Sequence, residues 1–334
     1  MGSIVLFSGI VLLSMSKKNK NSSGALLKEN QSSISISKKN EKSNAILPVG
    51  ESVVPLPLPK ENKLQSLPME EESDFPKIDR VFQLFTTSSS KLPIVETITY
   101  SSSVPWLKGR PAWVADYAVY FGTSKHFIAR SLNNSPDYFS QKVSVGSRFN
   151  VFKKDKKIEF HLLVDVKRLK MAFYYVDLDT HERVLLKIYP VGLGRIDLKK
   201  PSGTLTPLGS YQLGEKVSIY GPGITGLFHD QKTEMVRVFG SRWIPFGQEI
   251  EGCSEPAKGF GIHGAPWIVE SKSGDLVENR DCIGKYESDG CIRLLLEDVE
   301  EIYAITVTKP TFVHIGLNFH DITLPGVEVG TPSR

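Results

Sequence analysis

The sequence is poor in cysteine and in excess charge of either sign. Its 334 residues include three cysteines, no two of which stand at C-x-x-C spacing. That excludes a disulfide-framed scaffold and argues against a structural metal site. The net charge of +4 is spread thinly along the chain, so a nucleic acid is not an expected partner. No G-x-x-x-x-G-K-[ST] motif occurs, which disfavours a P-loop fold.

The apolar run near the N-terminus, Ile4 to Met15, is shorter than the roughly 18 to 20 residues that a spanning helix needs. We therefore interpret residues 1–15 as an export signal or membrane anchor, with a buried core segment as the alternative. Lysines follow this run and none precedes it, so the positive-inside rule alone would leave the remainder in the cytoplasm. We nevertheless expect export, with this segment as the only contact with the membrane.

No Phe, Trp or Tyr occurs between Ser16 and Asp74, where Ser, Asn, Lys, Pro and Glu dominate. Such a composition buries too little apolar area to offset the entropy lost on ordering. We predict a disordered tether over residues 16–75, with prolines stiffening its middle.

Aromatic residues return at Phe75, and residues 106–152 have the pattern of a small α+β unit. The string YAVYFG predicts a short strand and a glycine turn, and Ser124 is placed to cap a following helix. A second strand is predicted at Ser147 to Phe152. The order of Tyr, Val, Gly, Ser, Ile and Ala in this unit resembles the opening of a LysM repeat, which implies binding to wall glycan. An inert spacer domain is the alternative.

From Ile158 onward the chain is a series of short apolar strands punctuated by Gly and Pro, typical of a mainly β sandwich or barrel. One helix is predicted over Leu295 to Ala304, with Asp298, Glu300 and Glu301 facing out. The predicted strands are IEFHLLVDV (158–166), MAFYYVD (171–177), VLLKIYPVG (184–192), GSYQLGEKVSI (209–219), VRVFG (236–240) and PTFVHIG (310–316).

Two strings carry the candidate chemistry: GIHGAPW at 261–267 and SDGCIRL at 288–294. A thiol that follows Gly290 and stands just ahead of a helix is expected to have a lowered pKa, because backbone N–H groups and the helix dipole stabilise the thiolate. The N–H groups of Gly290 and Cys291 are expected to point at a developing oxyanion. His263 is the best candidate for the base. A buried structural cysteine and a structural histidine are the alternatives.

Together the two strings resemble the L,D-transpeptidase (YkuD) catalytic domain, which carries an [ST]-x-G-C box preceded by an H-G or H-S segment. Tyr189–Gly192, Thr206–Tyr211 and Phe239–Trp243 resemble further stretches of that domain. The resemblance covers residues 158–318 and implies a β-sandwich catalytic domain with a short helix towards its C-terminal end.

The resemblance also implies a role for each residue around the thiol. Cys291 would be the acylated nucleophile and His263 its proton acceptor. The Gly264 carbonyl would orient His263 by accepting a hydrogen bond from its other ring nitrogen. Ser288 and Gly290 would shape the turn that holds the oxyanion donors.

Arg293, Trp267 and Asp289 are the residues expected to bind substrate, although Arg293 fits a structural ion pair equally well. Asp289 stands where the family usually has His. A carboxylate there disfavours the thiolate unless it faces solvent or pairs, for instance with Arg293 or Lys285. Ser271 to Arg280 is an inserted polar loop of the kind that forms a lid or binds a partner.

Cys253 and Cys282 lie outside the box. In an oxidising periplasm they could pair and leave Cys291 free, and two independent thiols are the alternative. Sequence spacing leaves both open, because it does not give the distance between two Cα atoms.

The implied reaction is the cross-linking of peptidoglycan stem peptides, with no cofactor and no metal. Cys291 would attack the carbonyl after a diamino acid in a stem tetrapeptide, expel the terminal D-Ala and form a thioester. The amine of a neighbouring stem would resolve the thioester as a 3-3 cross-link, with His263 relaying protons. Water in place of the amine gives L,D-carboxypeptidase activity. The resemblance also implies acylation by carbapenems. A non-catalytic wall-binding scaffold is the alternative from another class, and the oligomeric state stays open.

Overall fold

The computed structural model describes residues 76–133, 143–215 and 217–330 of the chain. The predicted export segment at 1–15 and the predicted tether at 16–75 lie outside the described residues. In the described part, no helix has both the length and the apolar character needed to cross a membrane.

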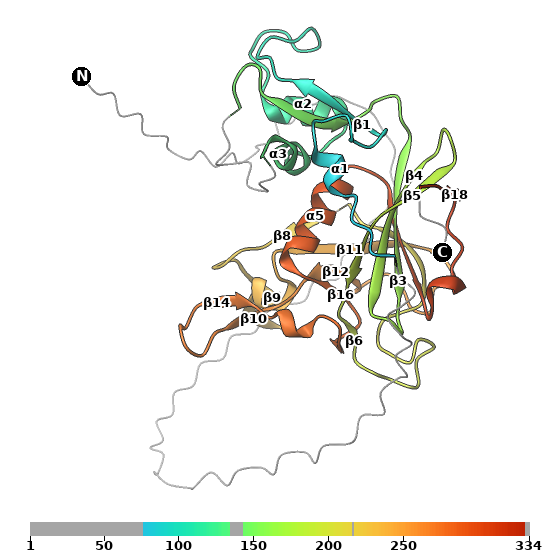
Figure 1. Ribbon diagram of the computed structural model, residues 1–334. Coiled ribbons are helices and arrows are strands. Elements are labelled where there is room, and N and C mark those ends of the chain that lie inside the picture. The colour runs from blue at the N-terminus through green and yellow to red at the C-terminus, as the bar shows by residue number, and fades with distance from the viewer. Residues whose placement is uncertain (1–75, 134–142, 216, 331–334) are drawn as a thin grey trace, which may run out of the picture. The chain divides into compact units, whose positions relative to one another are not determined.

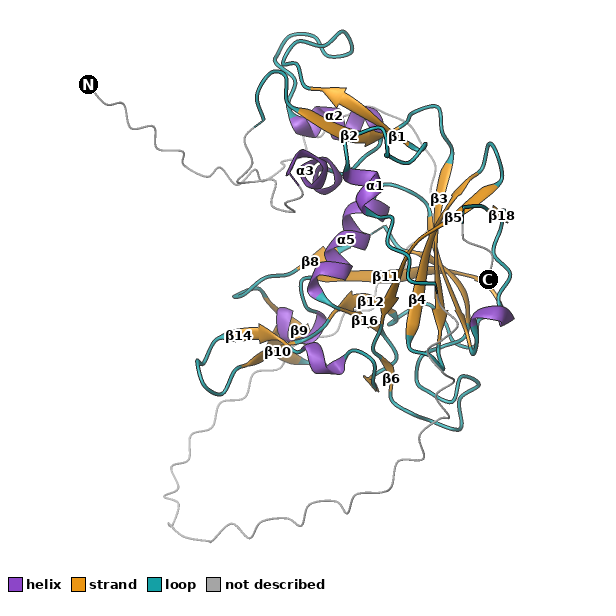
Figure 2. Cartoon of the chain, viewed as in Figure 1, coloured by secondary structure: helices purple, strands orange, loops and turns teal. Residues whose placement is uncertain are grey.

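The mainly β fold predicted from the sequence is confirmed (Figure 2). The longer helices are α2 (Val114–Phe121), α3 (Lys125–Asn133) and α5 (Leu296–Thr306), and single turns form α1 (Phe82–Phe85) and α4 (Val236–Phe239). The strands are β1 (Val95–Thr99), β2 (Arg148–Phe152), β3 (Ile158–Asp165), β4 (Lys170–Asp177), β5 (Glu182–Pro190), β6 (Leu193–Gly194), β7 (Gly209–Leu213), β8 (Ser218–Ile219), β9 (Thr225–Phe228), β10 (Gln231–Glu234), β11 (Arg242–Glu251), β12 (Gly261–Gly264), β13 (Trp267–Val269), β14 (Leu276–Glu278), β15 (Tyr286–Ser288), β16 (Ile292–Leu294), β17 (Thr311–Gly316) and β18 (Val327–Glu328).

The largest sheet has ten strands and runs in the order β16-β12-β11-β7-β17-β3-β4-β5-β18, with β8 paired to β11. Phe160 and Phe173 from one half of this sheet share a hydrophobic core with Ile262 and Ile292 from the other half. The sheet therefore curls around its core, and α5 lies beside β11 and β12 (Figure 1). The 3-10 turn Arg280–Cys282 leads into β15. The SDGC box at 288–291 begins at the last residue of β15 and continues through the turn before β16.

Helix α5 matches the predicted helix to within two residues, but its acidic side chains do not face solvent as predicted. Asp298 is buried, and Lys187 Nζ lies 3.2 Å from Asp298 and 2.9 Å from Glu301. Arg242 Nη2 lies 2.7 Å from Glu300. Burial raises the pKa of Asp298. The pattern on the helix alone misses this, because the cations come from β5 and β11.

The predicted strand at 236–240 is wrong, because these residues form the single turn α4. The N–H groups of Val238 and Phe239 both donate to the Met235 carbonyl, and the Gly240 N–H donates to the Val236 carbonyl. Gly240 has φ 60°, the left-handed conformation that ends a helix at low cost. The Val-Arg-Val alternation is too short to decide between strand and helix.

The predicted strand in YAVYFG is also wrong, because it forms helix α2. The Trp113 N–H donates to the Asp116 carboxylate at 2.8 Å, which starts the helix, and Gly122 with φ 56° ends it.

The second half of the predicted LysM-like module agrees with the structure. Ser124 Oγ accepts the Phe127 N–H at 2.9 Å and so caps α3, and β2 starts one residue after the predicted start of the second strand. Strand β2 pairs with β1, which precedes the predicted module. Residues 134–142 lie outside the described residues. The LysM assignment stays a prediction.

The segment 271–280 is not a simple loop as predicted. Strands β13 and β14 form an antiparallel hairpin with Trp267 opposite Glu278 and Val269 opposite Leu276. The Glu270 N–H donates to the Asp275 carbonyl at 2.8 Å and closes the turn. The insertion is thus a structured hairpin between the two halves of the candidate site.

Candidate active site

The two strings GIHGAPW and SDGCIRL form neighbouring parallel strands, β12 and β16. In their register Ile262 lies opposite Ile292 and His263 lies opposite Arg293. Ile262 and Ile292 are fully buried in the core. Because side chains alternate along strands and register partners share a face, His263 and Arg293 are on the other face of the sheet.

The pairing brings the segment that holds the thiol beside the strand that holds the imidazole. Cys291 directly precedes β16, and the backbone of Gly261, two residues before His263, acts on its thiol. Cys291 and His263 are 28 positions apart in sequence and thus come from neighbouring segments of the sheet.

His263 is 3% exposed, and its Nδ1 lies 2.7 Å from the Gly264 carbonyl oxygen. A carbonyl only accepts hydrogen bonds, so Nδ1 carries the proton and Nε2 is left with its lone pair. Burial lowers the pKa of His263 to about 4, against a smaller opposing effect of the Gly264 carbonyl, and Arg293 lowers it further. The imidazole is thus neutral at pH 7, in the tautomer that a base needs.

Two aromatic rings surround His263, and the sequence analysis assigned neither of them to the site. The Phe239 ring stands edge-on at 5.5 Å between centroids, and the Trp243 ring lies at 6.0 Å. Trp243 is the register partner of His263 on β11. The string FGSRW contains both rings, but only the pairing of β11 with β12 shows what they cover.

The thiol of Cys291 differs from the prediction. Burial raises its pKa to about 11, with a backbone contact to Gly261 and the charge of Arg293 acting in the opposite direction. Sγ lies 3.8 Å from the Gly259 carbonyl oxygen. The expected help from a helix dipole is absent, because β16 separates Cys291 from α5, which starts at Leu296. The lowered thiol pKa predicted from the sequence is therefore wrong.

The turn before Cys291 requires glycine. Gly290 has φ 114°, and a Cβ at this position would lie 2.6 Å from the Phe260 ring and 2.7 Å from the Leu205 carbonyl oxygen. Ser288 Oγ donates to the Cys291 carbonyl at 2.7 Å and accepts the Gly290 N–H at 3.1 Å. Ser288 and Gly290 thus shape this turn.

The same hydrogen bond overturns one predicted oxyanion donor. The Gly290 N–H is used by Ser288 and does not point at a bound substrate. Among the turn and loop hydrogen bonds of the described residues, none uses the Cys291 N–H. The Cys291 N–H is therefore the backbone donor that remains for an oxyanion.

Asp289 faces solvent and pairs with a partner that the sequence analysis did not consider. Arg195 Nη2 lies 2.6 Å from Asp289 Oδ1, so neither Arg293 nor Lys285 is the partner. Asp289 raises the pKa of Cys291, but it is the smallest of the causes and burial is the largest. The carboxylate is therefore not the main reason that the thiol stays protonated.

Arg293 lies at the centre of the site's electrostatics. Its charge lowers the pKa of Cys291, His263 and Cys282. Its Nε is buried without a hydrogen-bond partner in the described residues. Trp267 lies on the β13–β14 hairpin, half-buried. That either residue binds substrate stays a prediction.

Two loops flank the box. One holds Leu205, whose carbonyl oxygen lies against Gly290, and the other holds Gly259 and Phe260. The sequence analysis placed none of these residues at the site. Because Leu205 and Phe260 lie so close to the turn, a side chain at position 290 has no room.

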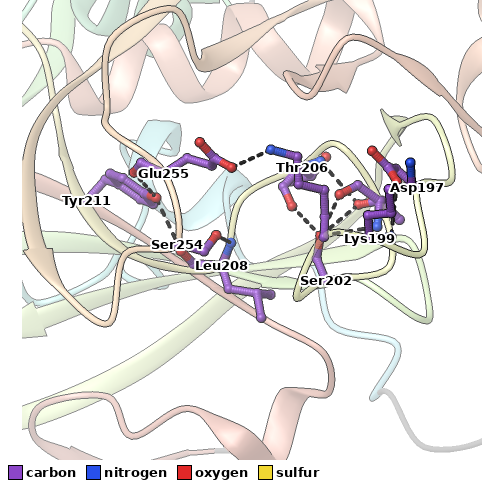
Figure 3. Close-up of polar contacts among 10 residues, drawn as sticks. Asp197, Lys199, Ser202, Thr206, Leu208, Tyr211, Ser254 and Glu255 are labelled. Atoms are coloured by element: carbon purple, nitrogen blue, oxygen red, sulfur yellow. Dashed lines mark hydrogen bonds and ion pairs between the residues drawn. The ribbon is translucent and has the colours of Figure 1, made fainter.

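Polar contacts hold these loops in place, as Figure 3 shows. Ser202 Oγ donates to the Thr206 carbonyl at 2.6 Å within the first loop, and the Tyr211 hydroxyl donates to the Glu255 carbonyl at 2.8 Å at the second. Lys200 Nζ lies 2.5 Å from Glu255 Oε1 and joins the two loops. The walls of the site are therefore cross-linked by side chains.

All three cysteines are free. Cys253 Sγ donates to the Ser210 carbonyl at 3.1 Å, whereas Cys282 is buried beside Arg293. The structure therefore has two independent thiols in place of the disulfide considered above.

Comparison with known proteins supports the resemblance over just under half of the chain. Residues 159–315 match the family model of the L,D-transpeptidase catalytic domain, YkuD. This segment is thus similar to an L,D-transpeptidase catalytic domain. No curated protein matches the sequence.

Solved structures give weaker matches. Bd1075 from Bdellovibrio bacteriovorus is 15% identical, with 48% of each chain covered and a TM-score of 0.30. The helical cell shape determining protein Pgp2 from Campylobacter jejuni is 19% identical, with 51% of each chain covered and a TM-score of 0.30. The chain thus spans about half the length of the structures that it matches.

Proposed function

We propose, from the L,D-transpeptidase-type domain at residues 159–315, that this protein forms 3-3 cross-links in peptidoglycan through a thioester on Cys291. The observation that supports the proposal is the pairing of β12 with β16, which brings the strand that carries His263 beside the strand that Cys291 precedes. The imidazole is neutral and oriented by Gly264, as a general base must be.

In the first half-reaction the Cys291 sulfur attacks the carbonyl after the diamino acid of a stem tetrapeptide. The thiol proton passes to His263 Nε2 as the carbon–sulfur bond forms, because both groups are neutral at rest. The Cys291 N–H donates to the oxyanion. When the carbon–nitrogen bond breaks, His263 returns the proton to the leaving amine of D-Ala.

In the second half-reaction the amine of a neighbouring stem attacks the thioester. His263 takes the proton from this amine, the carbon–sulfur bond breaks, and the proton returns to sulfur. Water in place of the amine gives a free carboxylate, which is L,D-carboxypeptidase trimming. No step requires a cofactor or a metal.

The second candidate is a non-catalytic scaffold that binds the wall. The raised pKa of Cys291 favours it, because a thiol that stays protonated at pH 7 is a poor nucleophile without its base. In this alternative residues 106–152 bind wall glycan and the catalytic domain retains only its fold.

Carbapenem acylation separates the two candidates. Purified full-length protein is incubated with a carbapenem, and its intact mass is recorded. A covalent adduct that is absent in Cys291→Ala and retained in Cys253→Ala supports the enzyme. No adduct, together with binding to isolated sacculi, supports the scaffold.

Analysis of the products distinguishes transpeptidation from trimming. Release of D-Ala from a tetrapeptide, with appearance of a 3-3 linked dimer, supports transpeptidation. Release of D-Ala with only tripeptide formed supports trimming. The proposed place of action is the periplasmic side of the envelope, with residues 1–15 as export signal or anchor, and fractionation of cells that express the full chain tests it.

A further inference from the structure

We infer that Arg195 and Asp289 form a specificity site for the zwitterion at the free end of the stem's diamino acid. This inference rests on the proposed function. The chemical class is an α-amino acid group, that is, an ammonium and a carboxylate on one carbon. Diaminopimelate ends in such a group, whereas lysine ends in an ammonium alone.

The two side chains form an exposed ion pair directly beside the nucleophile. Arg195 Nη2 lies 2.6 Å from Asp289 Oδ1, and the two side chains are 62% and 66% exposed. Neither makes another ion pair or side-chain hydrogen bond in the described part of the chain. The second carboxylate oxygen and the remaining guanidinium N–H groups therefore face solvent and are available to a ligand.

The backbone beneath the pair is fixed. The Arg195 N–H donates to the Ser288 carbonyl at 2.8 Å, and the Leu205 N–H donates to the Arg195 carbonyl at 2.9 Å. Asp289 lies between Ser288 and Gly290, in the turn that holds Cys291. A ligand held by this pair thus binds at the turn that precedes Cys291, and both side chains of the pair are exposed.

An exposed ion pair is easily exchanged for a ligand that mimics it. Such pairs contribute little to stability in water, because solvent screens the charges, so opening this one costs little. A zwitterion would give its carboxylate to the guanidinium of Arg195, which suits planar two-point recognition, and its ammonium to Asp289.

The pair also rejects ligands with a single charge. A lone ammonium meets the repulsion of Arg195, and a lone carboxylate meets that of Asp289, so each imperfect ligand leaves one charge unpaired. This explains in physical terms why an acid stands at position 289: with Arg195 it makes the site selective for both charges together.

Binding to the full-length Cys291→Ser variant tests the inference without turnover. Isothermal titration compares a diaminopimelate tetrapeptide with its distal carboxamide and its distal N-acetyl form. The free zwitterion should bind about tenfold more tightly than either blocked peptide, the usual effect of losing one charged hydrogen bond. Adding Arg195→Gln should abolish discrimination against the carboxamide, and adding Asp289→Asn should abolish discrimination against the N-acetyl form.

Lys199→Gln is the matched control, because it removes an exposed positive charge from the same loop and should keep both preferences. Equal binding of the three peptides, or no binding of any, overturns the inference. Unchanged preferences in both Arg195→Gln and Asp289→Asn overturn it as well.

The carbapenem adduct tests the proposed function separately. An adduct without a zwitterion preference leaves the function standing and removes the specificity site. A zwitterion preference without an adduct leaves the specificity site standing and removes the proposed function.

Discussion

The thiol of Cys291 and the imidazole of His263 rest as a neutral pair, because burial is the largest cause of both pKa shifts and disfavours both charged forms. The pKa of His263 falls to about 4 and that of Cys291 rises to about 11. Between these values the proton stays on sulfur until a substrate carbonyl is attacked. Under the proposed function, the attack would therefore be base-assisted and would not start from a preformed thiolate.

The first prediction follows from this neutral pair. Alkylation of Cys291 by iodoacetamide should be slow at pH 7 and rise about tenfold per pH unit towards pH 11, as the thiolate fraction grows. Peptide mapping by mass spectrometry, with rates measured from pH 6 to 11, gives the profile of Cys291 separately from those of Cys253 and Cys282. A rate that is already at its plateau near pH 7 would show a thiolate–imidazolium pair and contradict the prediction.

The second prediction concerns Gly290. Gly290→Ala should reduce carbapenem acylation at least about tenfold, because a φ of 114° and contacts at 2.6 and 2.7 Å force the turn to move, at a cost of order 1 to 3 kcal/mol. Gly284→Ala is the matched control: it also has a positive φ, but a Cβ there meets open space. If both variants react at the same rate, the close approach at Gly290 does not matter for the site.

At the scale of elements, helix α3 depends on one hydroxyl. Ser124 Oγ accepts the Phe127 N–H at 2.9 Å and donates to the Ala304 carbonyl of α5 at 2.6 Å. Phe127 packs with Phe152 in the core that also contains β3. The Ser124 side chain thus caps the N-terminal end of α3 and joins this helix to α5, the helix beside the candidate site.

The third prediction is that Ser124→Ala destabilises the protein by about 1 to 2 kcal/mol, the usual cost of losing a helix cap. Thermal unfolding followed by circular dichroism should show a midpoint lower by several degrees. Ser103→Ala, an exposed serine on the loop after β1, should leave the midpoint unchanged. A loss of stability in Ser103→Ala equal to that in Ser124→Ala would contradict the assignment of the cap.

Elements were predictable where the apolar pattern is long. Strands β3, β4 and β5 are runs of eight or nine residues, and each lies where the sequence predicts it. The failures are short: α2 and α4 look like strands over a few residues and become helical because Asp116, Gly122 and Gly240 supply the ends. Where the apolar periodicity is weak, the capping residues decide whether a segment forms a helix or a strand.

At the scale of the whole molecule, stability should depend on pH through buried histidines. Burial lowers the pKa of His126, His263 and His314 to about 4 and that of His161 to about 3. In the unfolded chain each has an ordinary pKa near 6.5. Between these values the unfolded state binds more protons than the folded state.

The fourth prediction follows from that difference. The contribution of these histidines to the free energy of unfolding should be constant above about pH 7 and fall steadily from pH 6.5 to pH 4, because the unfolded chain binds more protons in this range. Urea unfolding at half-unit intervals of pH measures it. Stability that does not change between pH 7 and pH 4 would contradict the neutral, buried state of these histidines.

The sequence by itself determined the mainly β fold, the strands with long apolar patterns, and the residues of the candidate site. These depend on local chemistry: side-chain alternation, a glycine before a cysteine, and a histidine between glycines. Only the tertiary structure decided the protonation state and the ion-pair partners of these residues. The raised pKa of Cys291 and the pairing of Asp289 with Arg195 both arise from loops and strands that are distant in sequence. Burial and charge pairing depend on which segments meet in space, and no local pattern contains that information.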